Sequence, residues 1–380
     1  MIYLDNAATS FPKPAACLRQ GLEDYLALGA SPGRGGYDAA GLAQARVRAV
    51  REQVAAYFGA PGWVTCFGHN ATDALNTLIL GLARPGSHLV STRLEHNSVL
   101  RPLHHLRQDR SCTLDLVPFN AAGLVDPAAI DRAIRPGTSL VVVNHASNVL
   151  GAVQPVAAVG RVCQARGVPL VLDCSQSAGA VPIRLRQWGA SALAFTGHKS
   201  LLGPTGVGGL VMEPGLDVRP SRFGGTGLDS SSLTHSRDLP ERLEAGTLNL
   251  LGILCLGRCL DYLQTPEAQA GATRERELHQ RLLAGLANLP GVTVDLPGAG
   301  PERLPLVSLN LAGWEPGDAG AVLDGDYGIA ARTGLHCAPL VHEDLGHGLA
   351  GSLRVSLGRF NRAADVDALL AALAAMLRGA

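Results

Sequence analysis

Short apolar runs alternate with segments of helical periodicity through the first two-thirds of the chain. The segments with helical spacing are 72–83, 99–106 and 155–165. The runs typical of strands are WVTCF (63–67), HLVST (88–92), TLDLVPF (113–119), SLVVVN (139–144), VPLVLD (168–173), SALAFT (191–196) and VGGLVM (207–212). This alternation predicts βαβ units, and therefore a mainly parallel sheet between helices, with ligands at the carboxyl ends of the strands.

The pattern changes near residue 250, where longer helical segments and fewer strands follow. We predict helices or strands there at 250–263, 273–289, 304–311, 352–357 and 364–379. The fold class is therefore α/β, with a large domain over 15–250, a smaller α+β domain over 251–380, and a segment 1–14 that packs near the ligand site. The glycine-rich span 222–247 lacks periodicity, and we expect a loop of that length to be functional or interfacial.

Composition excludes several classes of protein. Lysine plus arginine equals aspartate plus glutamate at 32 each, so no overall field favours nucleic acid or an anionic membrane. The start MIYLDNAATSFPKP is not a signal peptide, and no run of 18 apolar residues occurs, so we expect a cytoplasmic protein without membrane spans. The eight cysteines form no Cys-x-x-Cys pair and are expected to stay reduced.

Polar side chains follow most of the predicted strands, where a purely structural strand has no need of them. Each one alone has an ordinary explanation as a helix cap, a satisfied polar group or a surface charge. Together, in chain order, they offer an anion site at a helix start, a ring partner, an amide, an acid and an amine. The residues are Ala71, Thr72, His96, Asn148, Asp173, Gln176, Thr196, His198 and Lys199.

This combination fits one ligand, pyridoxal 5'-phosphate. Its aldehyde needs a partly desolvated lysine amine, which Lys199 supplies at the end of a buried strand. Its pyridine nitrogen needs a buried carboxylate, which Asp173 supplies. Its phosphate needs backbone amides and hydroxyls, and its ring needs a planar neighbour.

Other motif interpretations fail on context. GPTGVGG (203–209) follows the lysine and leads into a strand rather than a helix, so the mechanics of a dinucleotide-binding loop are absent. GHKS lacks the glycine spacing of a phosphate-binding P-loop. His336, Cys337, His342 and His347 have no common zinc-ligand spacing, and we predict no metal.

Motifs across the chain resemble the class V, fold type I pyridoxal-phosphate enzymes, and more narrowly the cysteine desulfurase and selenocysteine lyase branch. They are YLDNAAT (3–9), ATDALN (71–76), EHNS (95–98), SNVLGA (147–152), LDCSQSAG (172–179), TGHKSLLGPTGVG (196–208), EAGTLN (244–249), RTGLHCAP (332–339) and SLRVSLGRFN (352–361). Three details differ from many relatives: Asn70-Ala71-Thr72 replaces Gly-Thr-Thr, EAGTLN lacks a proline, and Asn97 replaces a second histidine.

The resemblance implies a role for each matched residue. Lys199 would form the Schiff base, Asp173 would pair with the pyridinium, and His96 would stack on the ring and serve as an acid or base. Asn148 and Gln176 would lie near the ring hydroxyl. The phosphate would be held by Ala71, Thr72, Thr196 and His198, and by Thr247 of the neighbouring subunit in a homodimer with shared active sites.

The resemblance also implies the activity. Arg354, with help from Arg332, would bind the carboxylate of L-cysteine. Cys337, flanked by two basic side chains that favour its thiolate, would accept sulfur as a persulfide, releasing alanine and passing the sulfur to an unidentified acceptor protein. A selenocysteine lyase, another class V aminotransferase or lyase, and a non-catalytic sulfur carrier remain as alternatives.

Overall fold

The computed structural model describes residues 1–33, 35–227, 231–296 and 302–379. Its centre is a seven-stranded sheet with the strand order β2-β8-β7-β6-β5-β3-β4. Strand β8 runs antiparallel to both of its neighbours, and the other pairs are parallel. The strands are β2 (Val64–Gly68), β3 (His88–Thr92), β4 (Thr113–Val117), β5 (Thr138–Asn144), β6 (Leu170–Asp173), β7 (Ala192–Thr196) and β8 (Gly208–Met212). The predicted mainly parallel sheet is confirmed.

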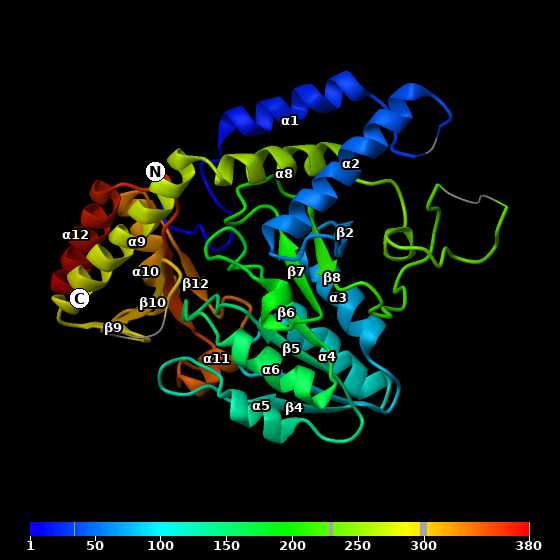
Figure 1. Ribbon diagram of the computed structural model, residues 1–380. Coiled ribbons are helices and arrows are strands. Elements are labelled where there is room, and N and C mark those ends of the chain that lie inside the picture. Colours follow the sequence, from blue (N-terminus) through cyan, green and yellow to red (C-terminus); the bar gives the residue numbers. More distant parts are fainter. Residues whose placement is uncertain (34, 228–230, 297–301, 380) are drawn as a thin grey trace.

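Both faces of this sheet are buried, and this explains the unbroken apolar runs. Along β5, Val141 and Val143 belong to one core cluster, whereas Leu140 and Val142 belong to the other. Successive side chains of a strand point to opposite faces, so one strand contributes side chains to two hydrophobic cores. Helices cover each face (Figure 1), and those of this part of the chain are α1 (Ala15–Leu28), α2 (Asp38–Tyr57), α3 (Ala71–Leu82), α4 (Asn97–Asp109), α5 (Pro127–Ala133), α6 (Val156–Arg166), α7 (Leu185–Trp188) and the 3₁₀ turn η1 (Glu241–Leu243).

A second, antiparallel sheet with the order β12-β13-β10-β9 forms the centre of the C-terminal part. Its own core includes apolar residues of three flanking helices. The elements of this part are α8 (Leu250–Leu263), α9 (Pro266–Ala287), β9 (Val292–Val294), β10 (Leu306–Leu311), α10 (Pro316–Tyr327), β11 (Ile329–Ala330), β12 (Arg332–Gly334), α11 (Pro339–Asp344), β13 (Ser352–Ser356) and α12 (Ala363–Gly379).

The predicted domain boundary remains a prediction. Helix α8 packs against α1 and α2 rather than mainly against the second sheet. Strand β1 (Ile2–Tyr3) pairs in parallel with β11, so the chain begins in contact with the C-terminal part. The following residues then run to the loop after β7, where the Ser10 amide donates to the carbonyl of His198.

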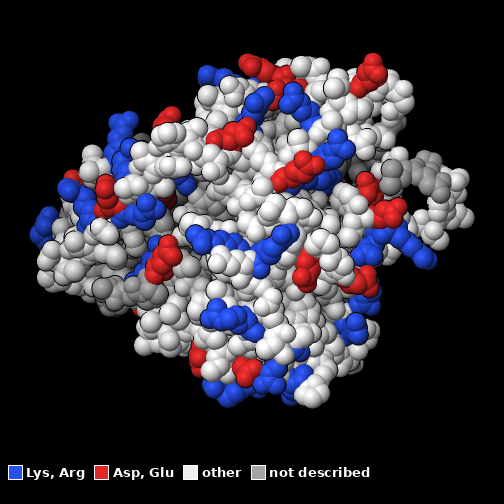
Figure 2. All heavy atoms as spheres, in the orientation of Figure 1, with Lys and Arg blue, Asp and Glu red and all other residues white. Residues whose placement is uncertain are grey.

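The surface carries charges of both signs. On the face seen in Figure 2, basic and acidic side chains are interspersed, in keeping with their equal numbers. None of the helices in the described residues has the length and apolar character that a membrane crossing needs. Part of the aperiodic span 222–247, namely 228–230, lies outside the described residues.

Candidate active site

A cavity of about 270 Å³ opens at the carboxyl ends of β5, β6 and β7. The structure brings most of the predicted site residues to this one place. Its lining includes Ala71, Thr72, His96, Asn148, Asp173, Gln176, Thr196, His198, Lys199 and Arg332, together with Ala8, Asn70, Ser98, Asn144, Ala146 and Ser175.

Asp173 ends strand β6 and is 5% exposed. Its Oδ1 accepts hydrogen bonds from the Ser175 amide at 2.9 Å and from the Ser175 hydroxyl. These two donors fix the plane of the carboxylate. Among the described residues, Oδ2 has no hydrogen-bond donor, and it is available to a cationic group in the cavity.

Lys199 follows β7, the neighbour of β6, so its amine enters the cavity beside Asp173. Burial lowers the pKa of Lys199 to about 8, and the positive charges of Arg354 and Arg332 add to this, while Asp173 opposes it. A lysine with such a pKa is partly unprotonated near neutral pH. It can therefore act as a nucleophile or a base.

His96 precedes helix α4 and caps it. Its Nδ1 accepts from the Ser98 amide at 3.0 Å and lies 2.8 Å from the Ser98 hydroxyl. Burial lowers the pKa of His96 to about 4, so the ring is neutral. Because Nδ1 accepts from a backbone N–H, the proton of the neutral ring lies on Nε2.

Another part of the cavity lining suits an anion. Helix α3 begins at Ala71, and Asn70 caps it by accepting from the Asp73 amide at 3.0 Å. Thr196 Oγ1 and His198 Nδ1 are buried and have no hydrogen-bond partner among the described residues. Two unpartnered polar atoms beside a helix N-terminus are what a bound phosphate would satisfy. The residues present thus fit pyridoxal 5'-phosphate.

Two predicted ring partners, Asn148 and Gln176, also make protein contacts. Asn148 Nδ2 donates to the carbonyl of His336 at 2.7 Å, and Gln176 Nε2 donates to the carbonyl of Ala7 at 3.1 Å. Both side chains still line the cavity. Their hydrogen bonds tie the C-terminal part and the N-terminal segment to the site.

Arg354 does not line this cavity. Its side chain is 1% exposed; Nη2 donates to Asp5 Oδ1 at 2.8 Å and Nη1 donates to the carbonyl of Asn148 at 3.0 Å. Its Nε is buried without a partner among the described residues. Arg332 pairs opposite Arg354 between β12 and β13 and does line the cavity.

Cys337 follows β12 and lies within reach of Arg332, whose Nη2 is 3.6 Å from the sulfur. The other seven cysteines are buried, whereas Cys337 is partly exposed. His336 and Cys337 both have left-handed backbone conformations, with φ of 49° and 59°. Burial lowers the pKa of His336 to about 2, so this ring is neutral. Of the two basic neighbours that were expected to favour the thiolate, only Arg332 is charged.

Thr247 is exposed and lies outside the lining of the cavity. Within the described residues, no group of three or more His, Cys, Asp or Glu side chains could hold a metal ion.

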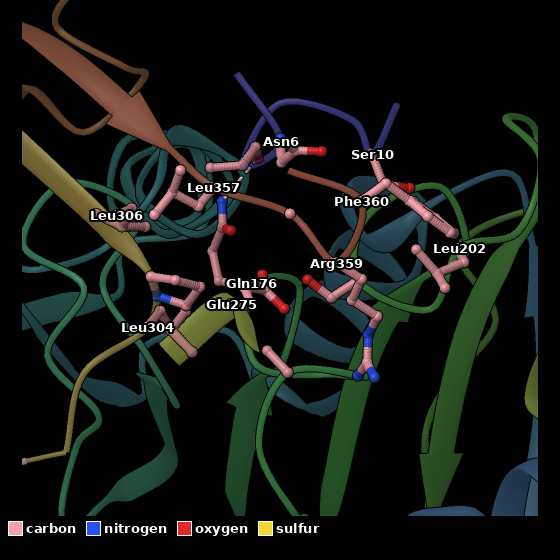
Figure 3. Close-up of a pocket in the computed structure, with 15 residues that line it drawn as sticks. Asn6, Ser10, Gln176, Leu202, Glu275, Leu304, Leu306, Leu357, Arg359 and Phe360 are labelled. Atoms are coloured by element: carbon pink, nitrogen blue, oxygen red, sulfur yellow. Dashed lines mark hydrogen bonds between the residues drawn. The ribbon is translucent and has the colours of Figure 1, made fainter. Parts of the chain in front are cut away.

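A second cavity of about 30 Å³ lies beside the N-terminal segment (Figure 3), where burial raises the pKa of Glu275 to about 7. It has room for about two water molecules and is too small for a cofactor.

Sequence reasoning missed several supporting residues. Asp5 pairs with Arg354, Ser175 holds Asp173, and Ser98 holds His96. The amide of Asn97 also donates to the carbonyl of Cys337 at 2.7 Å. Ser98 and Ser175 each lie two residues from the side chain they hold, so local spacing could have indicated them. The partner of Asp5 is 349 residues away and has no local signal.

Comparisons with known proteins agree with this geometry. A family model described as aminotransferase class-V matches residues 2–369. A probable cysteine desulfurase from Methanothermobacter thermautotrophicus is 32% identical over 374 residues, which cover 97% of this chain and 92% of the relative. A cysteine desulfurase from Serratia proteamaculans is 31% identical over 384 residues, covering 98% and 92%.

Solved structures give the same result. A cysteine desulfurase from Thermococcus onnurineus, solved in its apo form, superposes with a TM-score of 0.89 at 31% identity, covering 100% of this chain and 95% of that one. The cysteine desulfurase CsdA from Escherichia coli gives 0.86 at 28% identity, covering 99% and 94%. The predicted family and fold class are confirmed.

Proposed function

We propose that this chain, which belongs to the aminotransferase class-V family, is a pyridoxal-phosphate-dependent cysteine desulfurase that converts L-cysteine to L-alanine and keeps the sulfur as a persulfide. One observation carries the proposal. Lys199 and Asp173 line the same cavity as Arg332, which also contacts the partly exposed Cys337. A carbonyl-binding amine and a carboxylate thus share one cavity, and a thiol lies next to an arginine of its lining. The names of the relatives support the same activity.

The cofactor would be held at three points. Lys199 would bind its aldehyde, Asp173 would face its ring nitrogen, and the unpartnered Thr196 Oγ1 and His198 Nδ1 would meet its phosphate beside the start of α3. His96 would stack on the ring. When bound, pyridoxal 5'-phosphate supplies an electron sink that stabilises negative charge on the substrate carbon next to the amine.

The amine of Lys199 would take the proton from the α-carbon of the substrate and return it later. Its lowered pKa of about 8 leaves part of the amine unprotonated near neutral pH. Arg332, which lines the cavity, would bind the substrate carboxylate, and the buried Arg354 opposite it on the neighbouring strand would add positive charge. The neutral His96 ring lines the cavity and can donate a hydrogen bond through Nε2 to a group bound there.

Cys337 performs the sulfur transfer. Its thiolate forms an S–S bond with the substrate sulfur while the substrate C–S bond breaks, and the electron pair of that bond stays on the carbon skeleton. Protonation of the skeleton gives alanine, and the protein keeps a persulfide for an acceptor protein. Arg332 Nη2 lies 3.6 Å from the sulfur and can donate a hydrogen bond to it during this step.

A homodimer belongs to the same proposal. Thr247 is exposed and lies outside the lining of the cavity of its own chain, in keeping with a role at the site of a second subunit. Light scattering on the purified protein tests the dimer. A monomer that is fully active would contradict it.

The activity is tested by incubating the purified, cofactor-loaded protein with L-cysteine and measuring alanine. We expect alanine with L-cysteine and a much smaller rate for Cys337→Ala. A rate on L-selenocysteine that is far higher and does not depend on Cys337 would favour a selenocysteine lyase. A transaminated product without alanine would favour another class V enzyme, and no turnover at all would favour a non-catalytic carrier.

A further inference from the structure

Lys13 is one of only two lysines in the chain. The other is Lys199, and every remaining member of the 32 Lys and Arg residues is arginine. Arginine and lysine are not interchangeable where a site needs a compact point charge rather than a planar fork of five donors. The chemistry of Lys199 explains why it is a lysine. Lys13 has no such explanation in the reaction described above.

Lys13 lies against the backbone that carries Lys199. Its Nζ donates to the carbonyl of His198 at 2.6 Å and to the hydroxyl of Ser10 at 2.8 Å. The same carbonyl accepts from the Ser10 amide and the Thr9 hydroxyl, each at 3.0 Å. The Ser10 hydroxyl also reaches the carbonyl of Lys199 at 2.9 Å. Segment 9–13 therefore clamps the two peptide groups around Lys199.

This contact is not an ordinary surface ion pair. No carboxylate lies within salt-bridge distance of Lys13 among the described residues, and its side chain is only partly exposed. Burial lowers the pKa of Lys13 to about 8. Placing a cation there is costly unless its hydrogen bonds are well made. Its partners, a carbonyl and a hydroxyl oxygen, suit an ammonium and leave most donors of a guanidinium unsatisfied.

We propose that Lys13 is a positioning residue for the reaction, because its ammonium fixes the carbonyl of His198 and so the backbone from which Lys199 reaches the cofactor. The proposal rests on the role of Lys199 in the proposed function. Without Lys13, the amine of Lys199 samples more positions. The capture of the cofactor aldehyde then slows, and kcat falls with little change in KM, because the arginines that hold the substrate carboxylate lie elsewhere.

The test compares wild type, Lys13→Met, Lys13→Arg and Arg19→Met. Arg19 is an exposed cation of the adjacent helix α1 and serves as the matched control. Apo-protein is mixed with pyridoxal 5'-phosphate, capture is followed by visible absorbance, and the product is fixed with borohydride and mapped by mass. In either Lys13 variant, Lys199 is the only lysine left, so the mapping is unambiguous.

We expect Lys13→Met to slow capture by about tenfold, the effect of losing a charge-assisted hydrogen bond. Lys13→Arg should not restore the rate, and Arg19→Met should match wild type. Capture at the wild-type rate in Lys13→Met would overturn the proposal. If Lys13→Met does not fold, Ser10→Ala is used, because it removes the hydroxyl that bridges Lys13 and Lys199 and should also slow capture. Capture at the wild-type rate in Ser10→Ala would overturn the proposal. A wild type that captures the cofactor but makes no alanine would contradict the proposed function alone.

Discussion

The two halves of the site are built in different ways. Asp173 ends one strand and Lys199 follows its parallel neighbour, and both faces of these strands are buried, so the register of one sheet places the two residues together. Cys337 follows a short strand of the second sheet, with left-handed backbone at His336 and Cys337. Its position depends on hydrogen bonds from distant segments, namely those of Asn97 and Asn148. The cofactor half is thus rigid by topology, and the sulfur half is held by a few separate contacts.

This difference predicts that substitutions in the cofactor half (Asp173 and Lys199) abolish both cofactor attachment and alanine formation. Substitutions in the sulfur half (around Cys337) should leave cofactor binding intact and impair only sulfur transfer. Lys199→Ala should show no lysine-bound cofactor absorbance and should lose about 10⁴-fold or more in alanine formation, because the base and the attachment point disappear together. Visible spectra and amino-acid analysis measure the two effects. A normal absorbance band in this variant would contradict the assignment of Lys199.

Cys337→Ala should retain the cofactor absorbance of wild type while persulfide formation disappears and alanine formation falls by about 10²- to 10³-fold, because the acceptor of the sulfur is gone. Cys17→Ala, which removes a buried cysteine of α1, is the matched control and should behave as wild type. Loss of the cofactor band in Cys337→Ala would show that the two halves are not separable.

The cofactor half also predicts a pH dependence. Only the unprotonated amine of Lys199 attacks an aldehyde, and burial lowers the pKa of Lys199 from 10.5 to about 8. The rate at which apo-protein captures pyridoxal 5'-phosphate should therefore rise about fivefold from pH 7 to pH 8, about twofold more above pH 8, and then level off. Stopped-flow absorbance between pH 6 and pH 10, with N-acetyl-lysine as the reference amine, measures this. A rate that keeps rising through pH 10 would mean that the amine is solvated.

The smallest effect tests how Asn148 acts. In the structure its side chain holds the carbonyl of His336, which precedes the nucleophile. Asn148→Ala should therefore slow persulfide formation about fivefold, the cost of one lost hydrogen bond, while cofactor capture stays within about twofold. Quench-flow measurement of persulfide and absorbance measurement of capture separate these steps. The opposite pattern would assign Asn148 to the ring of the cofactor.

The sequence predicted the cofactor half because its information is local. The run 88–92 matches β3, the segment 250–263 matches α8, and polar residues at strand ends mark the edge of the sheet. Helix α2 was not predicted, because its apolar stripe is made largely of alanine and valine and is weak. Helix α9 begins at Pro266, seven residues before the predicted start, since Thr265 caps it and Pro266 opens its first turn.

The sulfur half could be predicted only as a set of residue types. Arg354 was predicted to bind the substrate carboxylate, and this stays a prediction; the sequence did not indicate that Arg354 is buried and paired with Asp5 from the other end of the chain. Such a pair depends on how the N-terminal segment crosses the second sheet. Neither the hydrophobic periodicity nor the local spacing of residues in the sequence indicates where the N-terminal segment crosses the sheet. The left-handed backbone of Cys337, which glycine would normally favour, is likewise invisible in a sequence without the fold.

The central claim is that sulfur from L-cysteine passes to Cys337. Cofactor-loaded protein is given a small excess of ³⁴S-labelled L-cysteine, quenched with an alkylating reagent, digested, and examined by mass spectrometry while alanine is counted in the same sample. The account predicts labelled persulfide on the peptide that contains Cys337 and one alanine for each labelled sulfur. Alanine formed with the label on another cysteine, or with no protein-bound sulfur, would contradict it.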